Sequence, residues 1–433
     1  MSDPSQRTPG PAAAVKKARL RRRHAAERRF RAYAIGAVAF AAGLLALLVA
    51  SIGVRAYSGF RQSYLTLPIV IDREIVDPEG TNDPAVLADA NYISLVKQAL
   101  RARFPEITAR SEQSALYSIV SVGAADSVKE YVLAHPQDIG RTVSLRLETA
   151  DSVDALVKGL TDRTLPADDR GISDLEVAWV DDLVASGELR VGFSRTLFTS
   201  GDSREPERAG ILAALTGSAM TLVVTFLLSF PLGVAAAVYL EEFAPRNRWT
   251  ALVEVNINNL AAVPSVIFGL LGLAILLNFF GLPRSSPLAG GIVLALMTLP
   301  TLIIAARAAI AAVPPSIREA ALAVGASDVQ VVLHHVVPLA LPGILTGSII
   351  GMARALGETA PLLMIGMVAF IVDVPHGFTE AATVLPVQIF IWADSPERGF
   401  VARTAAATAV LLFFLVMMNA TAVVLRRRFE RRW

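Results

Sequence analysis

The sequence predicts an all-α polytopic membrane protein with six transmembrane helices and a soluble α+β or α/β insertion between helices 1 and 2. Three observations support this fold class. Hydrophobic residues make up 54% of the 433-residue chain and charged residues only 18%. Several uncharged runs are long enough to cross a bilayer, and the charges are segregated along the chain. The chain carries more apolar surface than one soluble core normally buries, so we expect most of it to lie in a lipid bilayer.

The predicted spans follow from length, because a helix needs roughly 20 residues to cross a hydrocarbon layer of ~30 Å. A sixth span is expected in a run interrupted only by Arg354 and Glu358. The five uncharged runs and this sixth one are Ala32–Val54, Gly210–Leu240, Val255–Pro283, Ser285–Ala306, Thr404–Leu425 and Leu339–Val372.

Basic residues at both ends predict the orientation. Residues 1–31 form a tail with ten Arg and Lys against two acidic residues, and residues 426–433 form a second basic tail. Cytoplasmic flanks carry the excess of Arg and Lys, so both termini are expected in the cytoplasm, in agreement with an even number of crossings. A secretory signal peptide is the alternative for the first apolar run (32–54), but that run is too long.

The segment between the first two spans, residues 55–208, is polar. It holds 25 of the 38 acidic residues and 17 basic ones, a net charge of −8. Its length fits one domain outside the membrane. The pattern of Asn91–Leu100 predicts an amphipathic helix, whereas Ser114–Val122 and Arg141–Leu147 are β-prone.

Several chemistries are excluded by residue type. The chain has no cysteine, so it has neither disulfides nor thiolate metal ligands, and five scattered histidines make a zinc site unexpected. A phosphate-binding P-loop needs a lysine after a glycine-rich stretch, and no lysine follows Lys158. We therefore expect no cofactor in this chain, and ATP hydrolysis, if it is used, must occur on another polypeptide.

Residues 314–338 should form a short cytoplasmic helix between two spans. Ser316 and Glu319 have capping-box spacing, and Gly325 can end the helix in a left-handed conformation. An ordinary loop helix is the simplest interpretation. However, Glu319, Ala320 and Ala321, followed by Gly325 and closed by Pro338, resemble the EAA loop of binding-protein-dependent ABC permeases. The resemblance implies that this helix docks onto an ATPase.

Two further segments narrow the resemblance to one group of these permeases. Ala353–Leu363 (ARALGETAPLL) and Asn258–Gly272 (NNLAAVPSVIFGLLG) are similar to the phosphate-specific PstA-type permeases. The match covers a permease core at residues 209–425, and the first span and outer domain look like an extension. The resemblance implies location in the bacterial inner membrane and the following partners: a C-type permease subunit, an ABC ATPase dimer carrying ATP and Mg²⁺, a periplasmic phosphate-binding protein, phosphate and lipid. Nucleic acid is not expected.

Arg354 and Glu358 are the main candidates for the phosphate pathway, with Thr359 and Arg307 beside them. An arginine inside a span costs about 2.5–3.5 kcal/mol on insertion scales, so it should face protein or a water-filled path. Glu358, four residues later, can simply neutralise it, and this structural role stays open. The functional alternative is that the guanidinium binds phosphate oxygens in a forked geometry. Arg307 should snorkel to the cytoplasm.

Two other functions stay open. The chain could transport a different oxyanion such as molybdate or sulfate. However, a permease for such an anion should lack the signature at residues 353–363. It could also be a membrane-anchored sensor that works through residues 55–208, although a simple anchor has no need of an EAA loop.

Overall fold

The computed structural model describes residues 11–368 and 370–429 and divides into two units, residues 1–54 and 55–433. The first unit contributes most of helix α1 (Pro11–Gly59), which is unbroken through the first predicted span. Its apolar part is long and hydrophobic enough to cross a membrane, and its described side chains from Arg22 to Ala50 are exposed. Of the two predicted basic tails (1–31 and 426–433), residues 1–10 and 430–433 lie outside the described residues, and the rest belongs to α1 and to α20 (Gly399–Phe429).

Residues 55–208, named the outer domain after their predicted location, are built on a three-stranded antiparallel sheet. The strands are β1 (Arg61–Val70), β2 (Thr142–Glu148) and β3 (Leu189–Phe193), in the order β2-β1-β3. Leu65 pairs with Leu147 on one side and Leu189 on the other. Pro68 lies beyond the end of β3, where its missing N–H costs no ladder hydrogen bond on that side.

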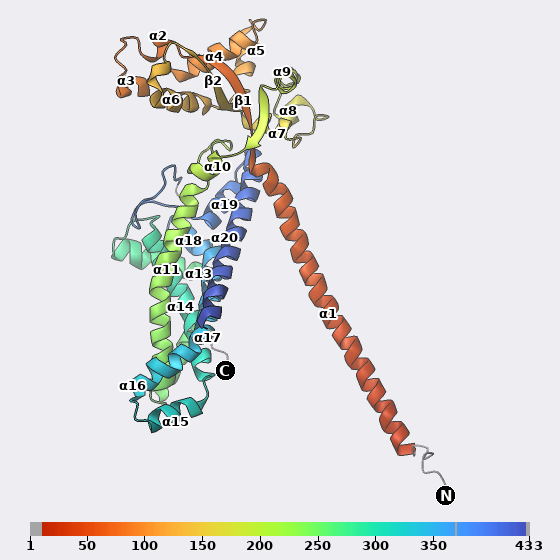
Figure 1. Cartoon of the computed structure of the whole chain (residues 1–433), viewed down its shortest axis with the longest axis vertical. Coiled ribbons are helices and arrows are strands. Elements are labelled where there is room, and N and C mark those ends of the chain that lie inside the picture. Colours follow the sequence, from red (N-terminus) through yellow and green to blue (C-terminus); the bar gives the residue numbers. More distant parts are fainter. Residues whose placement is uncertain (1–10, 369, 430–433) are drawn as a thin grey trace. The chain divides into compact units, whose positions relative to one another are not determined.

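Short helices surround this sheet (Figure 1). Their starts follow local signals: Asp83 caps the helix that begins at Pro84, and Ser173 and Glu176 form a full capping box. The helices are α2 (Arg73–Val76), α3 (Pro84–Ala88), α4 (Tyr92–Arg103), α5 (Arg110–Tyr117), α6 (Ala124–Ala134), the 3₁₀ turn η1 (Pro136–Asp138), α7 (Asp151–Val157), α8 (Ala167–Arg170), α9 (Asp174–Ala185) and α10 (Thr196–Thr199).

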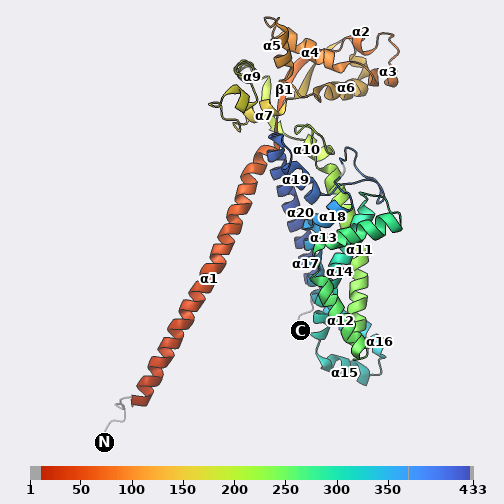
Figure 2. The ribbon, with the colours of Figure 1, turned by 180° about the vertical axis from the view of Figure 1, so that it is seen from behind.

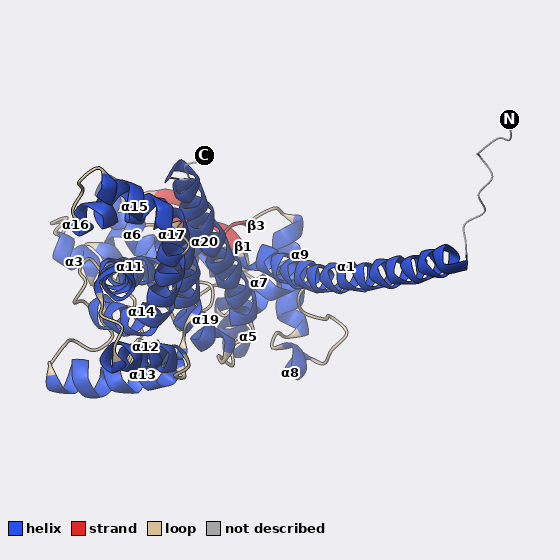
Figure 3. Cartoon of the chain, turned by 90° about the horizontal axis from the view of Figure 1, so that it is seen from below, coloured by secondary structure: helices blue, strands red, loops and turns tan. Residues whose placement is uncertain are grey.

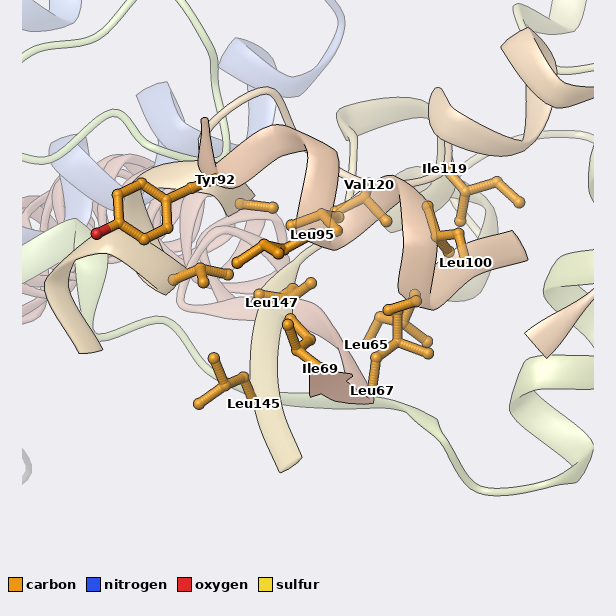
Figure 4. Packing of buried hydrophobic residues seen from close by; sticks show 14 of the residues in the cluster. Leu65, Leu67, Ile69, Tyr92, Leu95, Leu100, Ile119, Val120, Leu145 and Leu147 are labelled. Carbon is orange, nitrogen blue, oxygen red and sulfur yellow. The ribbon is translucent and has the colours of Figure 1, made fainter. Parts of the chain in front are cut away.

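A continuous aliphatic core holds the outer domain together. Leu65, Leu67 and Ile69 alternate along β1 and are fully buried, and Leu95 and Leu100 of α4 pack over them (Figure 4). The predictions for Asn91–Leu100 and Arg141–Leu147 are confirmed as α4 and β2. The strand predicted at Ser114–Val122 is wrong. Its first part belongs to α5, whose Leu116 is buried, and only Val120 forms a β-bridge.

The region predicted to be the permease core contains the remaining elements. They are α11 (Leu212–Val238) with its π-helical continuation η2 (Tyr239–Phe243), α12 (Arg248–Ala261), α13 (Ser265–Leu271), η3 (Gly272–Phe279), α14 (Pro287–Ala311), α15 (Pro315–Ala323), α16 (Asp328–Gln330), η4 (Val331–Val336), α17 (Val337–Gly357), α18 (Ala360–Met364), α19 (Leu385–Ala393) and α20 (Gly399–Phe429). Seen from below, α11, α14, α17 and α20 run side by side (Figure 3).

Five helices of the described residues are long and apolar enough to cross a membrane, and a sixth span arises only if one bent pair is counted. That pair lies where a single span was predicted at Val255–Pro283. The structure has two segments there, α12 and α13–η3, which meet at 103° (Figure 2). Pro264 explains the break, since proline keeps the preceding residue out of the helical region.

Glycines lie at close contacts between the helices of the core. A Cβ on Gly291 of α14 would lie 2.4 Å from Val224 of α11, and one on Gly269 would lie 2.7 Å from Pro361. Gly272 and Gly290 are equally close to their neighbours, so the small side chains are required for backbone approach. Pro231 and Pro300 lie inside continuous helices.

Candidate functional site

The span predicted at Leu339–Val372 ends early. The long helix begins at Asp328 and stops at Gly357. Glu358 has extended backbone torsions (φ −79°, ψ 122°), and α18 then begins with Pro361 in its first turn. Pro361 favours a break here, because its ring clashes with the carbonyl of residue 357 and it lacks the N–H of a helical hydrogen bond. The predicted sixth span is therefore shifted toward the N-terminus and followed by a break.

This break lies within the helix bundle. Leu356 before it and Leu362 after it pack in one buried cluster with Leu222 of α11 and Leu294 of α14. Leu222 is ten residues into α11, or about 15 Å along it. The backbone groups released at the break are thus surrounded by protein, the setting in which irregular backbone is tolerated at membrane depth.

At the break Arg354 contacts Glu358, and Thr359 is the next residue of the chain. Arg354 lies in the last turn of α17, and its Nε is 3.3 Å from Oε1 of Glu358, which lies just beyond the helix and not on its face. Among the described residues, the two terminal guanidinium nitrogens have no hydrogen-bond partner. Thr359 precedes α18 without using its hydroxyl to cap it. The Arg354 side chain is 47% exposed, so a forked donor pair faces outward from the chain.

Arg307 is separate from this group. It lies 13 residues after Leu294 on α14, about 20 Å further along the helix. Its guanidinium donates to Glu254 of α12 (2.8 Å) and Glu241 of η2 (3.3 Å). Two carboxylates from neighbouring elements thus pair with Arg307, and its expected snorkelling to the cytoplasm stays a prediction.

The predicted EAA segment forms α15, a turn at Gly325 and then α16 and η4. Gly325 has φ +88°, which confirms the left-handed helix end. The capping box predicted at Ser316 and Glu319 is wrong, because the helix already begins at Pro315, the position favoured for proline. A capping box occurs instead at Ser327 and Gln330. Pro338 does not end a loop but lies in the first turn of α17.

An arginine missed in the sequence fixes α15 to the bundle. Arg318 forms a salt bridge of 2.6 Å with Glu242 of η2 and donates to the carbonyls of Val313 (2.6 Å) and Ile310 (3.1 Å). Ala321 is buried on the same helix, whereas Glu319 and Ala320 are exposed. The helix therefore presents one face to the bundle and the other outward.

A second missed arginine lies at the opposite end of the core. Arg403 of α20 is 5% exposed. Its guanidinium donates to five acceptors of the outer domain and its linkers: the carbonyls of Gly59, Pro206 and Glu207, Oγ of Ser194 and Oε1 of Gln62. The sequence did contain a signal for this residue. Arg398 and Arg403 lie at the end of the last span that is predicted to be outside, where the positive-inside rule predicts few basic residues. The outer domain and α20 are joined through this side chain.

Family models match both parts of the chain. Residues 229–433 match the binding-protein-dependent transport system inner membrane component, and residues 17–167 match a domain of unknown function (DUF3333). The second match covers most of the N-terminal extension. It assigns no role to it.

Individual relatives match the permease core. The chain is 33% identical over 196 residues to the probable ABC transporter permease protein YqgH of Bacillus subtilis, covering 44% of this chain and 63% of that protein. It is 31% identical to phosphate transport system permease protein PstA 1 of Mycobacterium tuberculosis, covering 50% of this chain and 70% of the relative. It is 33% identical to PstA of Haemophilus influenzae, covering 46% and 70%. The chain therefore belongs to the binding-protein-dependent transport permeases, as a PstA-type ABC permease and not an enzyme.

Proposed function

We propose that this chain translocates inorganic phosphate across the bacterial inner membrane as one permease subunit of an ABC importer. In this proposal the chain has six spans, with the bent pair α12–η3 counted as one, and both termini are cytoplasmic. Residues 55–208 then form an α+β domain on the outer side. The basic tails support this orientation, and the names of the PstA relatives support the substrate.

The observation that carries the proposal is the guanidinium at the helix break. A planar donor fork suits phosphate, and the two terminal nitrogens of Arg354 have no hydrogen-bond partner among the described residues. We place Thr359, whose hydroxyl does not cap α18, in the same pathway. Discontinuous helices near the middle of a bundle are where transporters bind their substrates. Glu358 engages only Nε, so it orients the side chain and limits how tightly an anion is held.

The inner end of the core supports coupling to an ATPase. We assign docking to Glu319, Ala320, Ala321 and Gly325, with Pro338 joining the loop to α17. Around them, Leu322, Val324, Val329 and Leu333 are apolar and exposed. ATP and Mg²⁺ would be bound by an ABC ATPase dimer. A C-type permease subunit and a periplasmic phosphate-binding protein would complete the assembly.

Phosphate uptake per assembled complex in a deletion strain tests the role of Arg354. Arg354→Gln should insert and bind its ATPase but lose about 10- to 100-fold in uptake, the value of a charged hydrogen bond of about 1.5–3 kcal/mol. Arg354→Lys should recover little, because it lacks the fork. Arg398→Gln, which changes an exposed arginine of the outer surface, is the matched control.

The double variant separates transport from packing. If the pair only neutralises charge, Arg354→Gln/Glu358→Gln should regain the uptake lost in Arg354→Gln, and that result would reject the proposed role. If molybdate or sulfate competes with labelled phosphate in the wild type more strongly than unlabelled phosphate does, the transported substrate is another oxyanion.

A further inference from the structure

An apolar groove lies between three long helices of the core. Helix α17 contacts both α11 and α20 (Figure 3), and side chains of all three helices line a cavity of about 730 Å³. Leu222 and Ser348 are the buried residues of this lining, whereas Val223, Leu227 and Met417 are exposed along its rim. The groove is therefore open to the surroundings of the helix bundle.

The lining of the groove is matched to hydrocarbon. Every described residue that lines it is apolar apart from Ser348 and Thr421. Both hydroxyls already donate to carbonyls of their own helices, Ser348 to Ile344 (2.9 Å) and Thr421 to Met417 (2.8 Å). Methionine side chains adapt to irregular apolar surfaces, and three of them line this groove. A flexible apolar chain fits such a surface, and a polar ligand would lose hydrogen bonds there.

The length of the groove matches one leaflet of a bilayer. Its lining on α20 extends from Phe414 to Leu425, eleven residues further along the helix and about 16 Å away. Half of a hydrocarbon layer of ~30 Å is about 15 Å. An apolar chain that enters at the Leu425 end of the groove therefore reaches roughly the middle of the bilayer.

Arginines follow directly where the groove ends. Leu425 is the last lining residue of α20, and Arg426, Arg427 and Arg428 come next. Nη1 of Arg426 donates to Oγ1 of Thr346 (3.2 Å), so the guanidinium lies between α20 and α17 at this end. Its Nη2 has no hydrogen-bond partner among the described residues. A guanidinium with a donor to spare suits a phosphate group, so the groove joins an apolar channel to an anion-binding end.

The groove and the proposed phosphate pathway lie on opposite sides of α17. Leu345, Ile349 and Met352 line the groove and have the spacing of one helical stripe. Arg354 follows Met352 by two residues, which is about 200° around a helix of 3.6 residues per turn. In the proposed function Arg354 faces the phosphate pathway, so the groove faces away from that pathway and toward the lipid.

We infer that the groove binds an acyl chain of an anionic phospholipid whose phosphate accepts hydrogen bonds from Arg426. The inference rests on the proposed function in one respect, the side of α17 that faces lipid. Arg427 and Arg428 strengthen the attraction, because basic clusters at the cytoplasmic end of a span attract acidic lipids. In the proposed orientation the bound lipid belongs to the inner leaflet. It would hold α11 and α20 against α17.

Native mass spectrometry of the full-length chain, delipidated in detergent, tests the headgroup. Phosphatidylglycerol is the probe, and phosphatidylcholine with the same acyl chains is its zwitterionic match. Phosphatidylglycerol should bind at least about fivefold more tightly, the effect of one basic residue on an acidic lipid. Arg426→Gln should remove this preference, whereas Arg246→Gln, at an exposed arginine outside the groove, should keep it. Inorganic phosphate should not compete, because it has no acyl chain.

Two alanines of α20 test the apolar part of the site. Ala422 lines the groove, whereas Ala420 is exposed and is not part of the lining. Ala422→Phe should fill the groove and weaken binding of both lipids at least about tenfold, the effect of keeping two methylene groups out of an apolar site. Ala420→Phe should bind both lipids like the wild type. In membranes that contain the assembled complex, a phosphatidylglycerol with a photoreactive acyl chain should crosslink to residues of the lining.

Four results would overturn the inference. In the purified chain they are equal affinity for the two lipids, an unchanged preference in Arg426→Gln, and equal binding by Ala420→Phe and Ala422→Phe. In the assembled complex, a photoreactive side chain at Leu227 that crosslinks to another subunit and not to lipid would assign the groove to a protein partner. None of these measurements uses phosphate uptake, so a failure here is distinguishable from a failure of the proposed transport.

Discussion

The two ends of the permease core are each held by an arginine, but in different ways. At the inner end, Arg318 is 23% exposed and meets a carboxylate, Glu242, together with two carbonyls. At the outer end, Arg403 is 5% exposed and meets only neutral acceptors. Water can replace a lost partner at the inner junction but not at the outer one.

This difference indicates different mechanical roles. A partly buried ion pair can open and re-form, which suits a segment that responds to the proposed ATPase. A buried guanidinium with five acceptors is rigid, because breaking any part leaves polar groups without partners. The outer domain should therefore move with α20 as one body.

The largest effect is expected from Arg403→Gln. It leaves several buried carbonyls without donors and should lower the free energy of unfolding by about 3–5 kcal/mol. Thermal unfolding in detergent measures this. Arg398→Gln removes one exposed hydrogen bond, to the carbonyl of Asp169, and should change stability little. Equal effects of the two variants would show that the buried hydrogen bonds of Arg403 do not stabilise the junction between the outer domain and α20.

A pH effect should be confined to the outer junction. The pKa of Glu207 is raised to about 7 from an ordinary value of 4.5, so the folded state binds the proton more tightly than the unfolded state. Stability should fall as pH rises through 4.5 to 7, by at most about 3 kcal/mol from this group. Comparing unfolding of the wild type and Glu207→Gln at pH 5 and 8 isolates it. A variant with the wild-type slope contradicts the assignment.

Substitutions at the inner junction should lower the free energy of unfolding less. Arg318→Gln breaks a partly buried ion pair and should cost about 1–3 kcal/mol, with Glu242→Gln similar. Each single variant should reduce co-purification of the ATPase, and Arg318→Glu/Glu242→Arg should recover part of it. Without any recovery, α15 is fixed by something other than this pair.

The smallest change concerns Gly325. No atom lies within 4 Å of a Cβ built there, so only its positive φ resists substitution. Gly325→Ala should cost about 1–2 kcal/mol and Gly325→Asn less, since asparagine tolerates this conformation. Thermal unfolding and ATPase co-purification should follow this order. An alanine variant identical to wild type would mean that the turn relaxes freely.

Span positions were largely predictable because apolar length is a direct physical requirement of the bilayer. Helix ends were less so. Pro264 and Pro361 break helices at positions where the surrounding residues remain apolar, and hydropathy does not distinguish a straight span from a bent one. Gly325 was predictable because a left-handed end depends on one residue.

Tertiary partners were not predictable. Arg307 has Glu241 and Glu254 as partners, which are 66 and 53 residues away, and nothing local specifies that pairing. Strands β1 and β3 were missed for a related reason. Their pairing joins Leu65 to Leu189 across most of the outer domain, so neither short segment shows its role alone.

The sheet register has an evolutionary consequence. Arg61 at the start of β1 pairs with Phe193 at the end of β3, so the chain enters and leaves the outer domain at neighbouring points. Insertions with adjacent ends disturb a host fold least. In evolution such a segment can be lost by rejoining two strands that already touch.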